Sequence, residues 1–183
     1  MMEMVQIDAG QTELIEQAAV VLARTFPWND EWNTVHGARE EVHEILREGV
    51  VFAAVGNGQV LGLVGGLITY HGKTWELHPL AVRAGSRRSG VGRALVARLE
   101  EAARVAGAVT VMVGADDEDG RTNLSQIDDV YPLLPGLLAD IVSLDPTNPH
   151  PVDFYRKCGY QVVGLMPDAN GPRKPDILMA KRL

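Results

Sequence analysis

Residues 74–106 join an apolar strand-like run to a helix-like run through a short loop of arginines and glycines. The first run is "TWELHPLAVR", the loop is "SRRSGVG", and in the second run apolar residues recur at helical spacing until Gly107. Strand-like and helix-like runs alternate over most of the chain, and no internal repeat is visible. This order predicts an α/β or α+β fold built around one mixed sheet.

The same patterns place the other elements. We expect a strand at 3–8, helices at 11–25 and 36–48, strands on both sides of a turn at Gly56-Asn57-Gly58, a strand at 108–114, a helix at 150–158, and strands at 160–167 and 175–183. Residues 121–150 hold four prolines around an apolar, helix-like piece at 133–144. No change in composition marks a boundary, so we expect one domain over residues 1–183.

Two features predict irregular pairing of strands. Gly65 and Gly66 inside a strand indicate a bulge or a close approach of two backbones. Pro79 has no N–H, so its strand needs a bulge or a gap in the ladder. Such a gap would release the backbone N–H groups of Leu80 and Val82 for a ligand.

The charge balance narrows the class of partner. The 183 residues include 17 basic and 24 acidic residues, a formal net charge of −7. An acidic surface disfavours nucleic acid and favours cationic partners. No apolar stretch approaches the roughly 20 residues that cross a bilayer, and "MMEMVQID" is unlike a signal peptide. We therefore expect a cytoplasmic protein that binds neither nucleic acid nor a membrane.

Cysteine usage argues against two kinds of site. Cys158 is the one cysteine of the chain, so it has no partner for an internal disulfide. No zinc-ligand spacing of Cys or His accompanies it. We expect no metal.

The arginine loop has the chemistry of an anion site. A P-loop would need Lys followed by Ser or Thr after its second glycine, and a dinucleotide fingerprint would need a third small residue where Leu95 stands. What remains is a strand, a basic loop with two glycines and a helix start, where unpaired N–H groups and the helix dipole stabilise an anion such as a diphosphate. Alternatively, Arg87, Arg88 and Arg93 belong to a solvated turn.

Two motifs in this order resemble the GNAT acetyltransferase superfamily. Residues 87–92, "RRSGVG", resemble its Arg/Gln-x-x-Gly-x-Gly/Ala loop, which cradles the coenzyme A pyrophosphate, and residues 152–164, "VDFYRKCGYQVVG", resemble its later helix-to-strand element. Between residues 72 and 182, blocks such as "GKTWELHPLAV", "TNLSQIDDVY" and "KPDILMAKRL" are similar to the aminoglycoside 6'-N-acetyltransferases of the dimeric enterococcal type. The resemblance implies a GNAT fold with a central mixed, mostly antiparallel twisted sheet flanked by helices, acetyl-CoA (coenzyme A) as cofactor, and a homodimer.

The resemblance also implies where the cofactor lies. It places coenzyme A along the end of the strand and the following loop. The residues expected to contact it are Leu80, Ala81, Val82, Arg87, Arg88, Ser89, Gly90, Val91, Gly92, Arg93, Ala94 and Tyr155.

Acetyl transfer to an amine needs a neutral amine, a stabilised oxyanion and a proton for the departing thiolate. Glu76 is our candidate for attracting and deprotonating the ammonium, and His78, two residues further and on the same face, for orienting the substrate. The resemblance implies that the N–H of Leu80 polarises the thioester carbonyl. Tyr155 matches a position in the family's helix-to-strand element, which favours it as the acid that protonates the sulfur. Alternatively, Glu76 is an exposed strand glutamate, His78 a packed histidine before proline, and Tyr155 a core tyrosine.

The acceptor is expected near acidic and aromatic residues. "ADDEDG" follows a buried strand, where α/β sheets commonly bind ligands, and its charges suit a polycationic amine. Asp116 and Asp117 are therefore candidate substrate ligands, although the loop can also be a solvated turn or an adventitious cation site. Trp28 and Trp32 can supply an apolar wall for sugar rings, or can pack in the core or an interface.

These residues together predict a reaction. We expect direct transfer of an acetyl group from acetyl-CoA to the 6'-amine of aminoglycosides, an activity that confers antibiotic resistance. The alternatives are the same chemistry on another polyamine or on protein lysines, and a non-catalytic acyl-CoA sensor built on the same scaffold.

Overall fold

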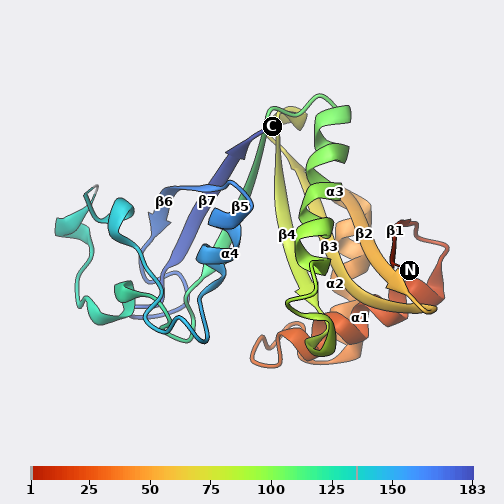
Figure 1. Cartoon of the computed structure of the whole chain (residues 1–183), viewed down its shortest axis with the longest axis horizontal. Helices are drawn as coiled ribbons and strands as arrows, with labels where there is room; N and C mark the ends of the chain where they lie inside the picture. Colours follow the sequence, from red (N-terminus) through yellow and green to blue (C-terminus); the bar gives the residue numbers. More distant parts are fainter. Residues whose placement is uncertain (1, 135) are drawn as a thin grey trace. The chain divides into compact units, whose positions relative to one another are not determined.

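The structure is a computed structural model that describes residues 2–134 and 136–183 (Figure 1). The chain divides into two compact units, Met1–Val111 with Leu183, and Met112–Arg182. The described residues form seven strands and four α-helices, and the strand pairs whose register is given are antiparallel. The mixed α/β class with a mostly antiparallel sheet, expected from the sequence, is confirmed.

The first unit contains four strands in the order β1-β2-β3-β4. They are β1 (Met2–Ile7), β2 (Gly49–Gly56), β3 (Gln59–Thr69) and β4 (Thr74–Val82). Asn57 and Gly58 join β2 to β3 with φ angles of 51° and 73°. Positive φ at both central residues is what a tight hairpin turn requires, so the turn predicted here is confirmed.

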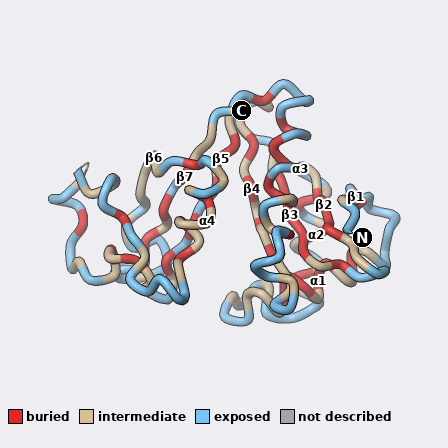
Figure 2. The backbone as a smooth tube through the Cα atoms, in the orientation of Figure 1, coloured by how far each residue is buried: buried red, intermediate tan, exposed pale blue. Residues whose placement is uncertain are grey.

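Three helices cover the two faces of this sheet: α1 (Thr12–Thr25), α2 (Val35–Glu48) and α3 (Val91–Val105). A Cβ at Gly66 of β3 would overlap Leu99 of α3, and one at Gly65 would lie 3.0 Å from Ile45 of α2. Because neighbouring residues of a strand face opposite sides, α3 and α2 lie on opposite faces (Figure 1). Buried residues follow these strands and the inner sides of the helices (Figure 2). Among the described helices, none has the length and apolar character needed to span a membrane.

The pairing of β3 with β4 is interrupted at the place that the sequence predicted. The register pairs on either side of the break are Val64 with Leu80 and Gly66 with Leu77. β4 therefore holds one extra residue next to Pro79. Opposite the break, a Cβ at Gly65 would overlap the carbonyl oxygen of His78. The expected break at Pro79 and the expected close backbone approach at Gly65 are both confirmed.

The second unit contains three strands in the order β5-β7-β6, and one helix. They are β5 (Thr110–Asp116), whose first two residues belong to the first unit, α4 (Pro151–Lys157), β6 (Gln161–Met166) and β7 (Asp176–Arg182). β6 and β7 are antiparallel, with Gln161 opposite Ala180. The unit's core is built from apolar side chains of β5, α4 and β7, of Tyr160 and of the segment between β5 and α4, whereas β6 has no buried residue.

The segment between β5 and α4 differs from the helix expected at 133–144. It contains 3₁₀ turns at Asn123–Gln126, Tyr131–Leu133 and Gly136–Asp140. The expectation was wrong because apolar spacing alone does not form a helix where proline removes backbone donors. Pro132 lies inside the second turn. Residue 135, the one proline within the expected range 133–144, lies outside the described residues.

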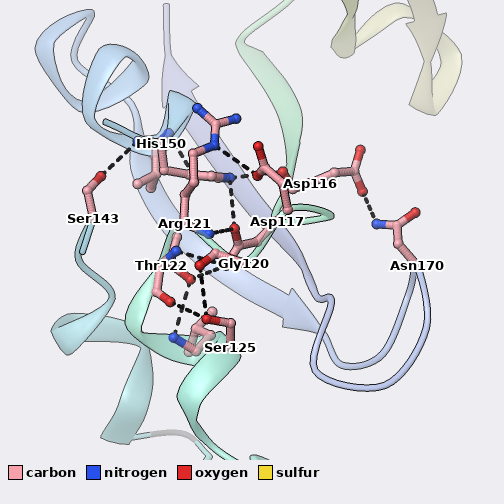
Figure 3. A network of polar contacts seen from close by, with 12 residues as sticks. Asp116, Asp117, Gly120, Arg121, Thr122, Ser125, Ser143, His150 and Asn170 are labelled. Carbon is pink, nitrogen blue, oxygen red and sulfur yellow. Dashed lines mark hydrogen bonds and ion pairs between the residues drawn. The ribbon is translucent and has the colours of Figure 1, made fainter. Parts of the chain in front are cut away.

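A buried aspartate organises this segment (Figure 3). The exposed fraction of Asp117 is 0%. Its Oδ1 accepts a hydrogen bond from the N–H of Arg121 at 2.6 Å, and its Oδ2 accepts from the N–H and the hydroxyl of Thr122 at 3.0 and 2.6 Å. A buried carboxylate is tolerated only with such donors. Asp117 therefore closes the loop 117–122 from the inside.

His150 connects the segment to α4. Its Nδ1 accepts a hydrogen bond from the N–H of Val152 at 3.2 Å and thereby caps the helix, whereas its Nε2 lies 2.9 Å from the carbonyl oxygen of Asp116 (Figure 3). The carbonyl can only accept, so Nε2 carries the proton. Burial lowers the pKa of His150, and the ring is neutral at pH 7.

We expect Gly65→Ala to lower the free energy of unfolding by about 2 kcal/mol, because the new Cβ would overlap the carbonyl oxygen of His78 and force β3 and β4 apart. Gly10→Ala is the control, since a Cβ there meets nothing within 4 Å, and it should change stability by less than about 0.5 kcal/mol. Urea unfolding followed by circular dichroism measures both. Equal stability of the two variants would contradict the close approach.

We expect the stability of the protein to fall on acidification through His150. The unfolded chain binds a proton near the ordinary pKa of 6.5, whereas the folded chain binds it only at lower pH. Between these two pKa values the free energy of unfolding falls as pH drops, by at most about 1.4 kcal/mol per pH unit. His150→Asn keeps a capping acceptor but cannot titrate, so its loss of stability from about pH 7 to about pH 5.5 should be smaller. Urea unfolding at both pH values tests this, with His71→Asn as the matched substitution at an exposed histidine.

Candidate functional site

The first part of the predicted site lies along β4. Glu76, His78 and Leu80 are half-buried, and the residues between them are buried. Glu76 and His78 lie on one face of the strand, on the side opposite to Leu77. Leu80 shares the face of Leu77, because the extra residue next to Pro79 shifts the alternation by one. The prediction that Glu76 and His78 share a face agrees with this pattern.

The backbone of β4 presents its amides in two directions. The N–H of Arg83 donates to the carbonyl oxygen of Leu61 on β3 at 2.9 Å. Successive N–H groups of a strand alternate between its two edges. The N–H groups of Val82 and Leu80 therefore point away from β3, which is the orientation that a ligand pairing with them needs.

The loop after β4 is held by its own short hydrogen bonds. The hydroxyl of Ser89 donates to the carbonyl oxygen of Ser86 at 2.6 Å, and Nε of Arg87 donates to the carbonyl oxygen of Val82 at 3.2 Å. Arg88 has a φ of 63° and is exposed. The loop thus exposes basic side chains directly before α3.

α3 begins at a glycine in a left-handed conformation. Gly90 is the N-cap with a φ of 92°, and a Cβ there would meet nothing within 4 Å. The first hydrogen bond of the helix runs from the N–H of Ala94 to the carbonyl oxygen of Gly90 at 3.0 Å, which leaves the N–H groups of residues 91–93 outside the helical pattern. The first turn contains no acidic residue. N–H groups outside the helical pattern and the positive end of the helix dipole are the features that favour an anion at the start of a helix.

The predicted cofactor residues of this unit thus lie in one continuous stretch of chain, which runs from the end of β4 through the basic loop to the start of α3. Ala81 and Val91 are buried, so only their backbone can reach a ligand. Arg88 and Arg93 are exposed and can offer their guanidinium groups.

A cluster that the sequence reasoning missed lies beside His78. Nε1 of Trp32 donates to Oε2 of Glu41 at 3.1 Å, and Nε2 of His78 lies 3.2 Å from Oε1 of Glu41. The hydrogen bond with His78 lowers the pKa of Glu41, so the carboxylate is ionised at pH 7. A sequence signal existed, because Glu41 follows Ala38 by three residues and precedes Ile45 by four, within the buried stripe of α2.

Trp28 is joined to this cluster by edge-to-face aromatic contacts. Its ring centroid lies 5.8 Å from that of Phe26, which lies 5.5 Å from that of Trp32. Trp32 in turn lies 5.3 Å from the ring of His78. Trp28 remains 57% exposed, as its predicted contact with sugar rings requires.

Tyr155, in the second unit, is packed between two aromatic rings. The centroids of Phe154 and Tyr160 lie 5.2 and 5.7 Å from its own. Tyr155 is 6% exposed, and this burial raises its pKa. The phenol therefore stays protonated at neutral pH, which an acid requires and which a core tyrosine shares.

The acidic loop after β5 has partners within its own unit. Asp116 is exposed and accepts a hydrogen bond from Nδ2 of Asn170 at 2.6 Å, and Asp119 pairs with Arg121 at 2.8 Å. Both oxygens of Asp117 are occupied in the buried network (Figure 3). Because Asp117 is fully buried, a substrate could contact it only if the loop opened. Substrate binding by Asp116 and Asp117 stays a prediction.

Solved structures of known proteins match almost the whole chain. The structure of the aminoglycoside 6'-N-acetyltransferase from Enterococcus faecium is 36% identical, with a TM-score of 0.87. An aminoglycoside 6'-N-acetyltransferase complexed with coenzyme A is also 36% identical, with a TM-score of 0.88, and an aminoglycoside 6'-acetyltransferase type Ii is 30% identical, with a TM-score of 0.74. Each match covers 98% of this chain and 96% of the other.

Sequence comparisons give the family. A search of curated proteins finds no match. The model of the acetyltransferase (GNAT) family matches residues 14–123, more than half of the chain, and this range includes β4, the basic loop and the start of α3. The chain belongs to the GNAT acetyltransferase family.

Proposed function

We propose that this protein transfers an acetyl group from acetyl-CoA to the 6'-amine of aminoglycosides. The observation that carries the proposal is the open start of α3, where a left-handed glycine, exposed arginines and N–H groups outside the helical pattern follow directly on β4. The choice of acceptor is supported by the matches to aminoglycoside 6'-N-acetyltransferases at 30% to 36% identity.

The residues present fit a cofactor that carries a diphosphate. Gly90 leaves open space above the helix start, and Arg88 and Arg93 bring positive charge to it. Coenzyme A, when bound, supplies the acetyl group as a thioester. The N–H groups of Leu80 and Val82, which point away from β3, offer hydrogen bonds to the thioester oxygen and to the pantetheine arm.

The side chains on β4 suit the acceptor amine. An alkyl amine is mostly protonated at pH 7 and must lose a proton before it attacks. The carboxylate of Glu76 attracts the ammonium and accepts this proton, directly or through water. His78, on the same face, orients the amine. The N–H of Leu80 stabilises the negative charge that develops on the carbonyl oxygen.

Tyr155 supplies the remaining proton in this proposal. Burial raises its pKa and keeps the hydroxyl protonated until the thiolate departs. Its position in "FYRKCGY" matches the helix-to-strand element that the family carries.

We further propose that residues 1–183 act as one acetyltransferase domain, in a cytoplasmic homodimer. The border between the two compact units falls inside β5, so no linker separates them. β6 and β7 expose Val163, Met166 and Leu178, apolar side chains of the kind that interfaces cover. A single cysteine suits a reducing compartment.

The test of the function is thiol release from acetyl-CoA in the presence of an acceptor. We expect release with kanamycin and with other aminoglycosides that carry a free 6'-amine, and none with those that lack it. Thiol release only with simple polyamines or with lysine peptides would show that the acceptor is not an aminoglycoside. Binding of acetyl-CoA without thiol release for any amine would indicate a sensor.

Arg88→Gln and Arg93→Gln should each raise the KM for acetyl-CoA about fivefold, since each removes one exposed ionic contact of about 1 kcal/mol. Arg104→Gln, at the other end of α3, is the matched control.

Tyr155→Phe should lower kcat by about a hundredfold and leave the KM for acetyl-CoA within about twofold, because the ring still fills its place but no longer donates a proton. Steady-state kinetics at saturating amine measure this. A kcat equal to that of the wild type would assign Tyr155 to the core alone.

A further inference from the structure

We propose that Glu41 is a positioning residue, which holds the imidazole of His78 with its proton on Nε2 and so sets how His78 meets the acceptor amine. This inference rests on the proposed function and adds to it a residue from α2. It depends on contacts within the first unit alone.

Each oxygen of the Glu41 carboxylate faces a different side-chain nitrogen. Oε1 faces Nε2 of His78 at 3.2 Å, and Oε2 faces Nε1 of Trp32 at 3.1 Å. An ionised carboxylate only accepts hydrogen bonds, and indole nitrogen only donates. His78 must therefore donate from Nε2, and in the neutral ring Nδ1 then holds the lone pair. A proton that the ring takes up goes to Nδ1, and the carboxylate behind Nε2 offsets the charge.

The three side chains contact one another. The ring of Trp32 meets the ring of His78 edge to face, at 5.3 Å between centroids and 67° between planes. The side chain of Glu41 is 16% exposed, whereas that of His78 is 35% exposed. Glu41 thus lies behind the histidine, and the histidine keeps the larger accessible surface. This burial argues that Glu41 acts through His78 and not by touching the amine itself.

Trp32 is itself fixed by the turn before α2. Oδ1 of Asn29 accepts hydrogen bonds from the N–H groups of Glu31 and Trp32 at 2.9 and 3.1 Å. The hydroxyl of Thr34 accepts from the N–H of Gly37 at 3.1 Å and caps α2. Both the indole donor and the helix that carries Glu41 are therefore anchored, which limits the positions open to the carboxylate.

The first test reads the protonation of His78 without any kinetic measurement. Long-range ¹H–¹⁵N correlation spectra distinguish the two neutral forms of an imidazole, and the signals of His78 are assigned by their loss in His78→Gln. We expect the wild type to show the Nε2–H form. Glu41→Gln can donate as well as accept, so we expect it to populate the Nδ1–H form. A wild-type ring in the Nδ1–H form overturns the proposal, and this result needs no variant of Glu41 to fold.

The second test separates position from charge. Glu41→Gln removes the charge, whereas Glu41→Asp keeps it on a side chain one methylene shorter, which cannot reach both donors. We expect each to lower kcat/KM for the amine about tenfold, mainly through KM, and to leave the KM for acetyl-CoA within about twofold. Glu44→Gln removes one charge from an exposed position on the same helix and should behave as the wild type. An Asp variant with wild-type kinetics would show that charge alone matters and would overturn the proposal.

The two tests also separate this inference from the proposed function. If the wild type acetylates no amine, the proposed function fails, while the ring spectra still decide whether Glu41 fixes the proton of His78. If the wild type acetylates aminoglycosides and Glu41→Gln matches Glu44→Gln, only the positioning role fails.

Discussion

The extra residue that β4 holds beside Pro79 is the constraint on which the first unit's site depends. Proline cannot donate to the ladder, and the strand passes so close to Gly65 that no side chain fits there. Beyond the break, the N–H groups of Leu80 and Val82 point away from β3. Because β4 leads directly into the basic loop, one stretch of chain positions the acidic side chain, the amides that point away from β3 and the start of α3.

The two charged loops of the chain differ in how their charged side chains are paired. The acidic run after β5 is satisfied within its own unit, by backbone N–H groups, by Arg121 and by Asn170. The basic loop before α3 exposes Arg88 and is followed by N–H groups outside the helical pattern. The net charge of −7 therefore says less about the site than the local pairing of each charge does.

Local chemistry was readable from the sequence, and distant contacts were not. The turn at Asn57-Gly58 and the break at Pro79 follow from the conformations that these residues allow, and both were predicted. The helix expected at 133–144 was not formed, because apolar spacing was weighed above proline. Glu41 was missed because its partner His78 lies 37 residues away. The internal role of Asp117 was hidden for a similar reason, since its donors are backbone groups that no side-chain pattern reveals.

The shared carboxylate between Trp32 and His78 has a consequence for how this protein can change over time. Replacing any one of the three residues removes a contact partner of the other two, whose side chains are positioned for that partner. The effects of single replacements at positions 32, 41 and 78 on stability and activity should therefore not add up to the effect of a joint replacement. If His78 meets the acceptor as proposed, a library that randomises all three positions at once samples combinations that stepwise selection does not reach.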